Sequence, residues 1–333
     1  MLTLNDPLLS VIIPTYNRPE YLRRAVDSAL ESSIDNLIEV IVVPNGGDLS
    51  WKTSLKDLLS DKRLVISEVK DANANIARNH GLQISKGRYV RFLDDDDFLY
   101  PLNCQQQLKD IIKKDSDLSV AGFDILDSDK NIIDTHSINI TYSDFHSFIF
   151  SHDRTTHVCS YLFKKEFLKN VTWDECCKIG QDVHFVFEII SQRMKIDYIF
   201  CNYCTGAWVQ HMSLRISTTF NINNHYKTSF EAILKAIQSI DYKNHLFNKR
   251  LEIAIECMWD YCHKGFVHNP VYWSKSILKI RSLKKDSWPN DKIYIKLKYI
   301  HPLILEWFFY PYRFFKHPLL NLFKVKAKKS FWE

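Results

Sequence analysis

The residues from Gly87 to Asp97, GRYVRFLDDDD, decide the fold. A short apolar run from Arg88 to Leu93 reads as a strand and leads directly into four adjacent aspartates. Adjacent carboxylates repel one another and are costly to hold together unless a cation or solvent compensates them. Oxygen-rich loops suit hard ions such as Mg²⁺ and Mn²⁺. The four aspartates lie at the carboxyl end of the predicted strand, and this position favours a metal site over the alternative, a solvated acidic turn.

Before this stretch, β-rich runs alternate with helical patterns. The sequence predicts strands over 8–13, 38–43 and 64–69 and helices over 19–32, 51–59 and 75–85. This alternation is typical of an α/β domain with a largely parallel sheet. Ligands of such sheets bind beyond the carboxyl ends of the strands. The loops that follow the strands, at 15–17, 44–47 and 94–97, are therefore the candidates for chemistry.

The later part of the chain changes character twice. Strand-like runs lie between 118 and 138, with a predicted hairpin turn over 127–131, and a helix is expected over 182–193. After about Phe220 the sequence becomes a series of helical segments rich in Lys, Ile, Tyr and Trp. We therefore expect an α/β domain over 1–220 and a helical C-terminal region over 221–333.

Composition excludes several classes of protein. With 333 residues and 46% hydrophobic content, the chain can bury a large core, so disorder is not expected. A net charge of +5 is weak evidence for nucleic-acid binding. The N-terminus shows no signal-peptide pattern, and no apolar run approaches the roughly 18 residues of a membrane span, so we expect a cytoplasmic protein. Eight scattered cysteines suit a reducing compartment, and the lone CxxC at Cys201 and Cys204 does not make a zinc or redox site.

Three motifs in order resemble the family 2 glycosyltransferases. They are SVIIPTYNR at 10–18, ARNHG at 77–81 and the acidic stretch at 87–97, and the similarity covers roughly residues 8 to 215. The resemblance implies the GT-A fold, a Rossmann-like α/β architecture with a mostly parallel sheet and flanking helices. It also implies transfer of a sugar, with inversion, from a nucleotide diphosphate donor held through Mn²⁺ or Mg²⁺.

The resemblance also implies roles for particular residues. Arg78 is expected near the base or the diphosphate, although it can instead cap a helix or pair with the acidic loop. Asp94 and Asp95 would face the ribose, and Asp96 would bind the metal. The nucleotide would be contacted by the loop after the first strand, at Pro14, Thr15, Tyr16 and Asn17.

The loop after the second strand departs from the family pattern. Members often carry two acidic residues there, whereas this chain reads PNGG at 44–47. Asn45 can still hydrogen-bond a nucleobase edge, because its amide offers both a donor and an acceptor. The alternative is a glycine turn with Asn45 in a left-handed conformation.

The resemblance points to Asp182 as the base that takes the acceptor's proton. Gly180, Gln181 and Asp182 precede a helix with apolar residues beneath it, and glutamine stands where relatives carry a first acid. The alternative is that Asp182 only caps the helix, a position that aspartate favours.

His211 matches the position of a histidine that completes the metal site in many relatives. Neutral imidazole is a competent Mn²⁺ ligand, although a lone histidine is more often structural. Arg215 and Ser217 are candidates to reach diphosphate oxygens. We expect structural or acceptor-side roles for the histidines without such context, His152, His157 and His184.

The C-terminal stretch from Tyr294 to Trp332 interleaves Trp, Tyr and Phe with Lys and Arg. Aromatic rings prefer the headgroup level of a bilayer, and basic side chains favour anionic lipid. Glu306 and Pro311 interrupt any spanning helix. This composition favours peripheral attachment to the cytoplasmic face of the inner membrane. The alternative is a helix pair that covers the catalytic domain or forms a dimer contact.

Taken together, the sequence predicts a glycosyltransferase of bacterial surface polysaccharide synthesis, such as that of O-antigen or capsule. UDP-sugar is the expected donor, and a glycan, such as one linked to polyprenyl diphosphate, is the expected acceptor. One alternative enzyme is a sugar nucleotidyltransferase, but residues 14–19 lack the glycine-rich loop that cradles a triphosphate. The other alternative is a catalytically degenerate relative that acts as a binding or scaffold protein.

Overall fold

The computed structural model describes residues 6–35, 37–138, 142–155, 157–210, 222–239, 246–289 and 292–324. The chain divides into two compact units. Unit 1 comprises Met1–Ile149 and Asp153–Thr219, and unit 2 comprises Phe150–His152 and Phe220–Glu333.

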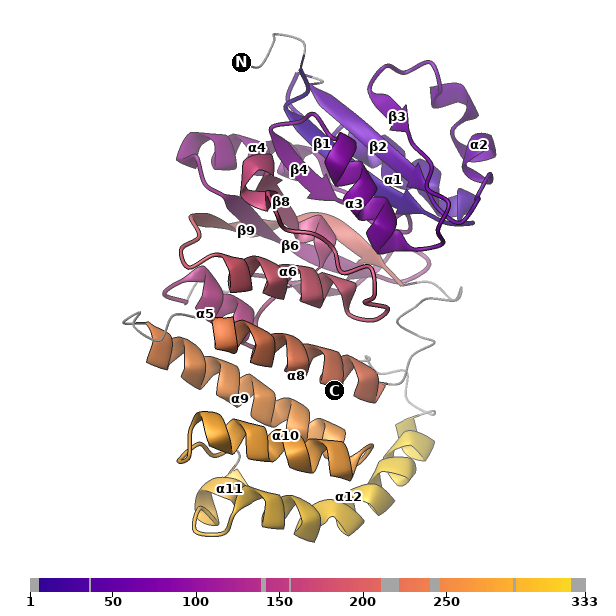
Figure 1. Ribbon diagram of the computed structural model, residues 1–333. Coiled ribbons are helices and arrows are strands. Elements are labelled where there is room, and N and C mark those ends of the chain that lie inside the picture. The colour runs from indigo at the N-terminus through magenta and orange to yellow at the C-terminus, as the bar shows by residue number, and fades with distance from the viewer. Residues whose placement is uncertain are drawn as a thin grey trace. The chain divides into compact units, whose positions relative to one another are not determined.

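Unit 1 begins with a parallel half-sheet built as the alternating pattern predicts (Figure 1). Its strands lie in the order β3-β2-β1-β4, and every pair among them is parallel. Their carboxyl ends therefore meet at one edge, which brings the loops after β1, β2 and β4 together. The strands are β1 (Leu9–Thr15), β2 (Ile38–Pro44), β3 (Leu64–Ile66) and β4 (Tyr89–Phe92). The intervening helices are α1 (Pro19–Leu30), the short α2 (Trp51–Ser54) and η1 (Lys56–Leu58), and α3 (Ala74–Ile84).

Helices cover both faces of this half-sheet because β1 is apolar on both sides. Val11 and Ile13 belong to the same core cluster as the apolar face of α1. Ile12, one residue out of phase, faces α3, where a Cβ on Gly81 would lie 2.4 Å from its Cγ2. Glycine at this position therefore lets α3 approach the sheet and carry Arg78 towards its carboxyl edge.

The rest of the sheet is mixed, which differs from the largely parallel sheet expected. β8 lies between β4 and β6 and is antiparallel to both, while β9 is parallel to β6 and antiparallel to β5. The predicted turn at 127–131 joins β6 to β7 in an antiparallel hairpin, with Asp127 N donating to Asn131 O at 3.0 Å. These strands are β5 (Phe98–Leu99), β6 (Leu118–Leu126), β7 (Ile132–His136), β8 (Tyr161–Lys164) and β9 (Tyr198–Val209).

Further helices complete unit 1. The helix α6 begins one residue before its predicted start, so Asp182 lies in its first turn. All eight cysteines lie in the described part of the chain and are free thiols, in agreement with the absence of a disulfide pattern. The helices are α4 (Pro101–Lys114), α5 (Phe145–Phe150, whose last residue belongs to unit 2), η2 (Val158–Ser160), η3 (Lys165–Leu168) and α6 (Gln181–Gln192).

The described part of unit 2 is helical. Trp273 is fully buried at its centre, donates to Asn223 Oδ1 at 2.9 Å, and fills the space that a side chain on Gly265 would occupy. None of the described helices has the length and apolarity needed to cross a bilayer. The helices are α8 (Ile222–Ser239), α9 (Phe247–Phe266), α10 (Pro270–Leu283), α11 (Lys292–Lys296) and α12 (Pro302–Lys324).

Candidate active site

The acidic loop after β4 is held by the loop after β1. Thr15 Oγ1 donates to Asp95 Oδ2 at 2.7 Å, and Arg18 Nη1 lies 3.3 Å from Asp95 Oδ1 and 2.7 Å from Asp96 Oδ2. Burial, and then the charge of Asp96, raises the pKa of Asp95 to about 7. The loop thus concentrates negative charge that Arg18 only partly compensates.

Asp97 is the most deeply buried of the four aspartates, and both of its carboxylate oxygens contact other groups of the protein. Its Oδ1 accepts from the backbone N–H of Val209 at 3.0 Å, and its Oδ2 lies 3.3 Å from His157 Nε2. The His157 ring stacks on Phe123, with centroids 4.7 Å apart. Burial, and then the charge of Asp96, raises the pKa of Asp97 to about 6. His157, which we expected to be structural or acceptor-side, therefore fixes the acidic loop against the second half of the sheet.

Arg78 links three elements at the carboxyl edge of the sheet. Its guanidinium donates to Asn75 Oδ1 at 2.9 Å, to Gln181 Oε1 at 2.8 Å and to Asp94 Oδ1 at 2.7 Å. The same group lies over the buried ring of Trp173, 4.5 Å from its centroid. Arg78 therefore pairs with the acidic loop, one of the alternatives weighed from the sequence. Trp173 is a residue that sequence reasoning missed.

Asp182 lies close to this network without being bonded into it. Among the described residues, its carboxylate has no hydrogen-bond or ion-pair partner. It does not cap α6, because the N-cap residue is Gly180 in a left-handed conformation. Burial, and then the charge of Asp94, raises the pKa of Asp182 to about 6. The geometry leaves a proton acceptor facing the acidic loop, with neutral Gln181 beside it serving as the acceptor for Arg78.

The loops after β1 and β2 form one cradle. Asn45 is buried and uses its side-chain amide to donate to Thr15 O at 2.8 Å, so it ties β2 to β1. It is Asn17, with φ of 52°, that adopts the left-handed conformation considered for Asn45. The backbone N–H of Asn17 donates to Asp48 Oδ2 at 2.9 Å. Pro14 is buried within β1, whereas half of Tyr16 is exposed at the rim of the cradle.

Asp48 is a buried acid of the second loop that sequence reasoning did not single out. It follows the Gly46-Gly47 pair, is 8% exposed, and also accepts from Ser50 N at 2.8 Å. Its carboxylate therefore holds the backbone of the two loops together.

Comparison with known proteins agrees with these motifs. Residues 10–172 match the family described as "Glycosyl transferase family 2". This matched stretch, just under half of the chain, is similar to that family along its length.

Two curated relatives illustrate the range of the family. Over 193 residues, or 56% of the chain, it is 30% identical to the minor teichoic acid biosynthesis protein GgaB of Bacillus subtilis. This stretch is only 21% of GgaB, so the chain spans about a fifth of that relative. An uncharacterized glycosyltransferase of Methanocaldococcus jannaschii is 27% identical over 59% of the chain and 69% of its own length.

The solved structures establish the fold of this chain. TarS of S. aureus (residues 1–349), crystallised with UDP-GlcNAc, superposes with a TM-score of 0.64 at 16% identity. The match covers 82% of this chain and 80% of that one. The expected GT-A fold with additional C-terminal helices is therefore confirmed, with a curled, mixed sheet.

The acidic loop suits a hard divalent cation. Carboxylate oxygens of Asp94, Asp96 and Asp97 lie within 4.8 Å of one another. Both oxygens of Asp97 contact protein groups, while Asp96 pairs with Arg18 through Oδ2 and Asp94 with Arg78 through Oδ1. All-oxygen ligands of this kind match Mg²⁺ or Mn²⁺. The predicted ligand His211, with Arg215 and Ser217, lies outside the described residues.

Gly46 allows a test of the cradle, because a matched glycine follows it. Both Gly46 and Gly47 have positive φ, 65° and 74°, but a Cβ on Gly46 would lie 2.7 Å from Tyr16 Cε2 and 2.8 Å from Ala72 Cβ, whereas one on Gly47 would meet nothing within 4 Å. We expect Gly46→Ala to displace Tyr16 and weaken UDP binding about tenfold or more, and Gly47→Ala to add only left-handed strain of about 1 kcal/mol. Calorimetric titration with UDP and thermal unfolding measure the two effects. Equal UDP affinities in the two variants would contradict a role for Tyr16.

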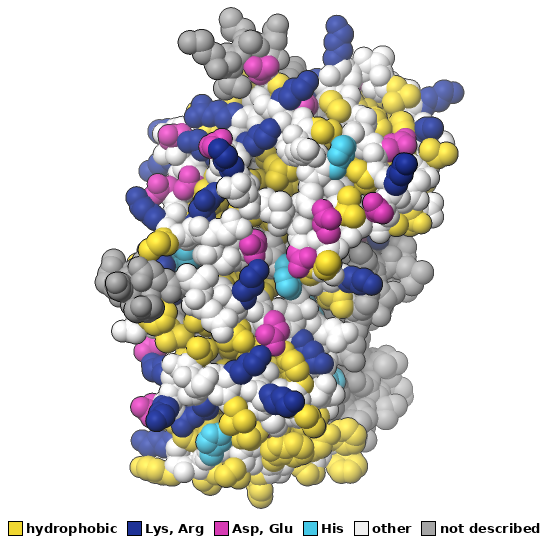
Figure 2. Space-filling model, in the orientation of Figure 1, with side chains coloured by type: hydrophobic (Ala, Val, Ile, Leu, Met, Phe, Trp, Pro, Cys, Tyr) yellow, Lys and Arg dark blue, Asp and Glu magenta, His cyan; other side chains and the backbone are white. Residues whose placement is uncertain are grey.

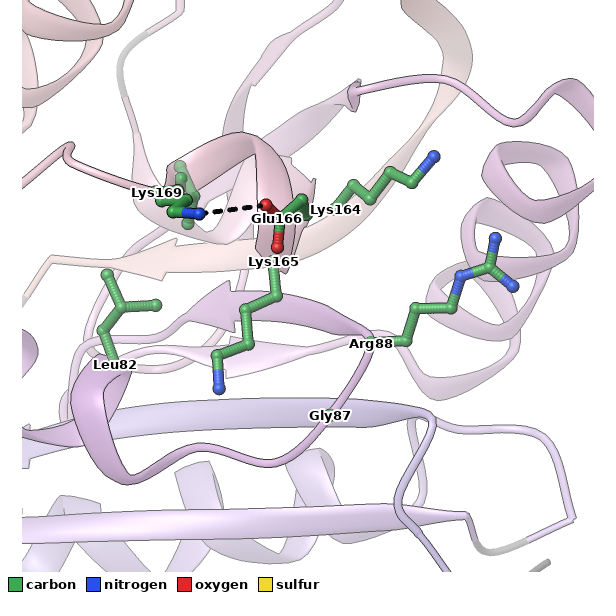
Figure 3. Close-up of a pocket in the computed structure, with 8 residues that line it drawn as sticks. Leu82, Gly87, Arg88, Lys164, Lys165, Glu166 and Lys169 are labelled. Carbon is green, nitrogen blue, oxygen red and sulfur yellow. Dashed lines mark ion pairs between the residues drawn. The ribbon is translucent and has the colours of Figure 1, made fainter. Parts of the chain in front are cut away.

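A surface pocket of about 570 Å³ lies away from these residues (Figure 3). It is formed where β4 begins and β8 ends, whereas the acidic loop follows the opposite end of β4. Its cations are already engaged: Arg88 and Lys164 pair with Asp115, Lys169 pairs with Glu166, and Lys165 donates to Ser85 O. We assign the pocket no part in the chemistry. It is lined by Leu82, Gly87, Arg88, Lys164, Lys165, Glu166, Leu168 and Lys169.

Proposed function

We propose that this chain is an inverting glycosyltransferase that moves a sugar from a nucleoside diphosphate donor to a hydroxyl group of a glycan acceptor. The observation that carries the proposal is the arrangement around Asp182. A carboxylate with a raised pKa and no bonded partner among the described residues faces an acidic loop suited to a cation, and Arg78 bridges this loop and the neighbouring Gln181. This arrangement combines a proton acceptor with a site for a diphosphate leaving group.

The donor side of the proposal uses the loops at the carboxyl edge. Tyr16, Asn17 and Asn45 would surround the base, with Pro14 and Thr15 shaping the first loop. Asp94 and Asp95 would face the ribose, and Arg78 would lie beside the diphosphate. UDP is the proposed nucleotide because TarS, which shares the fold, is described in complexes with UDP-GlcNAc and with UDP.

The reaction would be a single displacement. Asp182 takes the proton from the acceptor hydroxyl as its oxygen attacks the anomeric carbon, and the bond to the diphosphate breaks on the opposite face. Attack from that side inverts the configuration, and no covalent intermediate on the protein is needed. Asp96, with His211 as a second proposed ligand, would hold Mn²⁺ or Mg²⁺, which when bound neutralises charge on the diphosphate.

For the acceptor we propose a surface polysaccharide intermediate, such as that of O-antigen or capsule, linked to a lipid at the cytoplasmic face of the inner membrane. The similarity to GgaB, described as a minor teichoic acid biosynthesis protein, supports polymer synthesis as the setting. A scaffold protein that has lost catalysis is the second candidate, and the neutral Gln181 is the observation in its favour. A nucleotidyltransferase is disfavoured by the absence of glycine from residues 14–19.

The test of this proposal is turnover of a set of donors. We expect one of the UDP-, GDP-, CDP- and dTDP-sugars to release its nucleoside diphosphate in the presence of Mn²⁺, and proton NMR of the released or transferred sugar to show an inverted anomer. A protein that remains folded and binds a nucleotide but turns over none of these donors, with membrane lipid extract supplied as acceptor, would favour the scaffold alternative.

A further inference from the structure

The helix α12 has an unusual distribution of side chains. Surface helices usually turn their apolar stripe inward and their charges outward. From Pro302 to Phe315, every exposed side chain of α12 is apolar or aromatic. Phe308 and Phe315 are 75% and 70% exposed. We call this set the aromatic face; it consists of Ile304, Trp307, Phe308, Pro311, Tyr312, Phe314 and Phe315.

The charged residues of this segment point the other way. Glu306 is 1% exposed, and its carboxylate lies 2.6 Å from Arg313 Nη1 and 2.9 Å from His263 Nδ1. Tyr294 also donates its hydroxyl to Glu306. This buried network joins α9, α11 and α12 within unit 2. Because it fixes the rotation of α12 about its axis, it determines that the aromatic face is turned outward.

The surface next to the aromatic face is basic. Lys296 and Lys298 are exposed, and Tyr299 between the two helices is 90% exposed. Between residues 292 and 333 the sequence holds two acids, Glu306 and Glu333, of which the first is paired with Arg313 in the buried network. The basic residues of the same stretch are Lys292, Lys296, Lys298, Arg313, Lys316, Lys324, Lys326, Lys328 and Lys329.

We propose that the aromatic face of α12 inserts into the headgroup region of an anionic membrane. Phe and Ile side chains would enter the acyl boundary, Trp307 and Tyr312 would lie at the headgroup level, and the lysines would contact lipid phosphates. Figure 2 shows hydrophobic side chains gathered at the end of the view where Figure 1 draws α12. The contact is peripheral, since no described helix is suited to span a bilayer.

Charge favours an anionic membrane over a second copy of the chain as the partner of the aromatic face. An isologous contact would bring one basic margin against another, and like charges in an interface repel. An anionic bilayer instead complements the excess of nine basic over two acidic residues after position 291. The inference extends the proposed attachment to the inner membrane, because it identifies the aromatic face of α12 as the surface that makes the contact. It concerns unit 2 and does not depend on the transfer reaction.

The test is sedimentation of the full chain with vesicles of phosphatidylcholine, with and without phosphatidylglycerol. We expect binding to the mixed vesicles that weakens as salt is raised. The double variant Phe308→Ser with Phe315→Ser should bind about tenfold or more weakly, because both rings are exposed and their loss removes apolar area available to the bilayer. Lys296→Glu with Lys298→Glu should reduce binding to the mixed vesicles alone.

A matched control removes two equally exposed apolar side chains from unit 1. Leu59→Ser with Leu102→Ser should leave vesicle binding unchanged, since these residues are 53% and 79% exposed but lie outside α12. Retained binding by the double phenylalanine variant, or no preference for anionic vesicles, would overturn the proposal. A dimer in sedimentation equilibrium that the same variant dissociates, without vesicle binding, would assign the face to a second copy. UDP binding by each variant separates these outcomes from failure of the catalytic site.

Discussion

Asp182→Asn is expected to lower the turnover number for sugar transfer by roughly 10²- to 10⁴-fold, the range usual for loss of a general base. Asparagine has nearly the same shape but cannot accept the acceptor's proton. The carboxylate it replaces has no bonded partner among the described residues, so the substitution breaks no contact. The affinity for UDP should change little. Steady-state release of UDP and calorimetric titration with UDP measure the two quantities.

The same variant should not lose stability. The pKa of Asp182 is raised to about 6, above its unfolded value near 3.8, so the folded state disfavours the ionised form. The stability contributed by the protonated form is therefore lost as pH rises through about 6. At pH 8 the asparagine variant should melt no lower than the wild type. Glu188→Gln, on the same helix, is the control and should keep full activity. Unchanged turnover in Asp182→Asn would remove the base assignment.

Arg78→Met should reduce both activity and stability. Methionine fills much of the space over Trp173 but leaves the acceptors on Gln181 and Asp94 without their donor. Buried acceptors left unpaired cost roughly 1–3 kcal/mol, and the partial exposure of Asp94 argues for about 2 kcal/mol here. The acidic loop and the first turn of α6 would lose their common link. We therefore expect turnover to fall about 100-fold. Steady-state kinetics measure the turnover, and the unfolding temperature measures the loss of stability.

Two further arginine variants define what Arg78 supplies. Arg78→Lys keeps the charge but cannot reach all three acceptors in the fork geometry of a guanidinium, so it should rescue stability only in part. Arg88→Met removes an exposed arginine that pairs with Asp115 at 3.3 Å, and it should shift stability by less than about 0.5 kcal/mol. If Arg78→Met behaved like Arg88→Met, the bridging role would be wrong.

The parallel half-sheet was predictable because its information is local. Each strand is a short apolar run, each loop carries polar residues immediately after it, and the ordered motifs resemble one family. The position of the four aspartates at a strand's carboxyl end followed from the same pattern. The strand β8 was not predictable in this way, since its antiparallel place between β4 and β6 depends on pairing with residues 41 to 75 positions away.

The finer chemistry of the site depends on contacts between distant residues. Asp97 and His157 are 60 positions apart, and nothing in the sequence distinguishes Asp97 from its three neighbours before the fold brings His157 to it. The role of Asp48 was likewise hidden, because its bond to the backbone N–H of Asn17 joins residues 31 positions apart. The orientation of α12 likewise depends on the buried Glu306, which the sequence presents only as an interruption of an apolar run.

The most direct test of the central claim is thermal unfolding of the wild type and of Asp96→Asn with UDP, each with and without Mn²⁺. A nucleotide at about a hundred times its dissociation constant stabilises a protein by roughly 2.7 kcal/mol, which raises the unfolding temperature by a few degrees. We predict that UDP stabilises the wild type only when Mn²⁺ is present and that Asp96→Asn loses this stabilisation. Equal stabilisation of both proteins by UDP, with or without metal, would contradict the assignment of the acidic loop as the metal and diphosphate site.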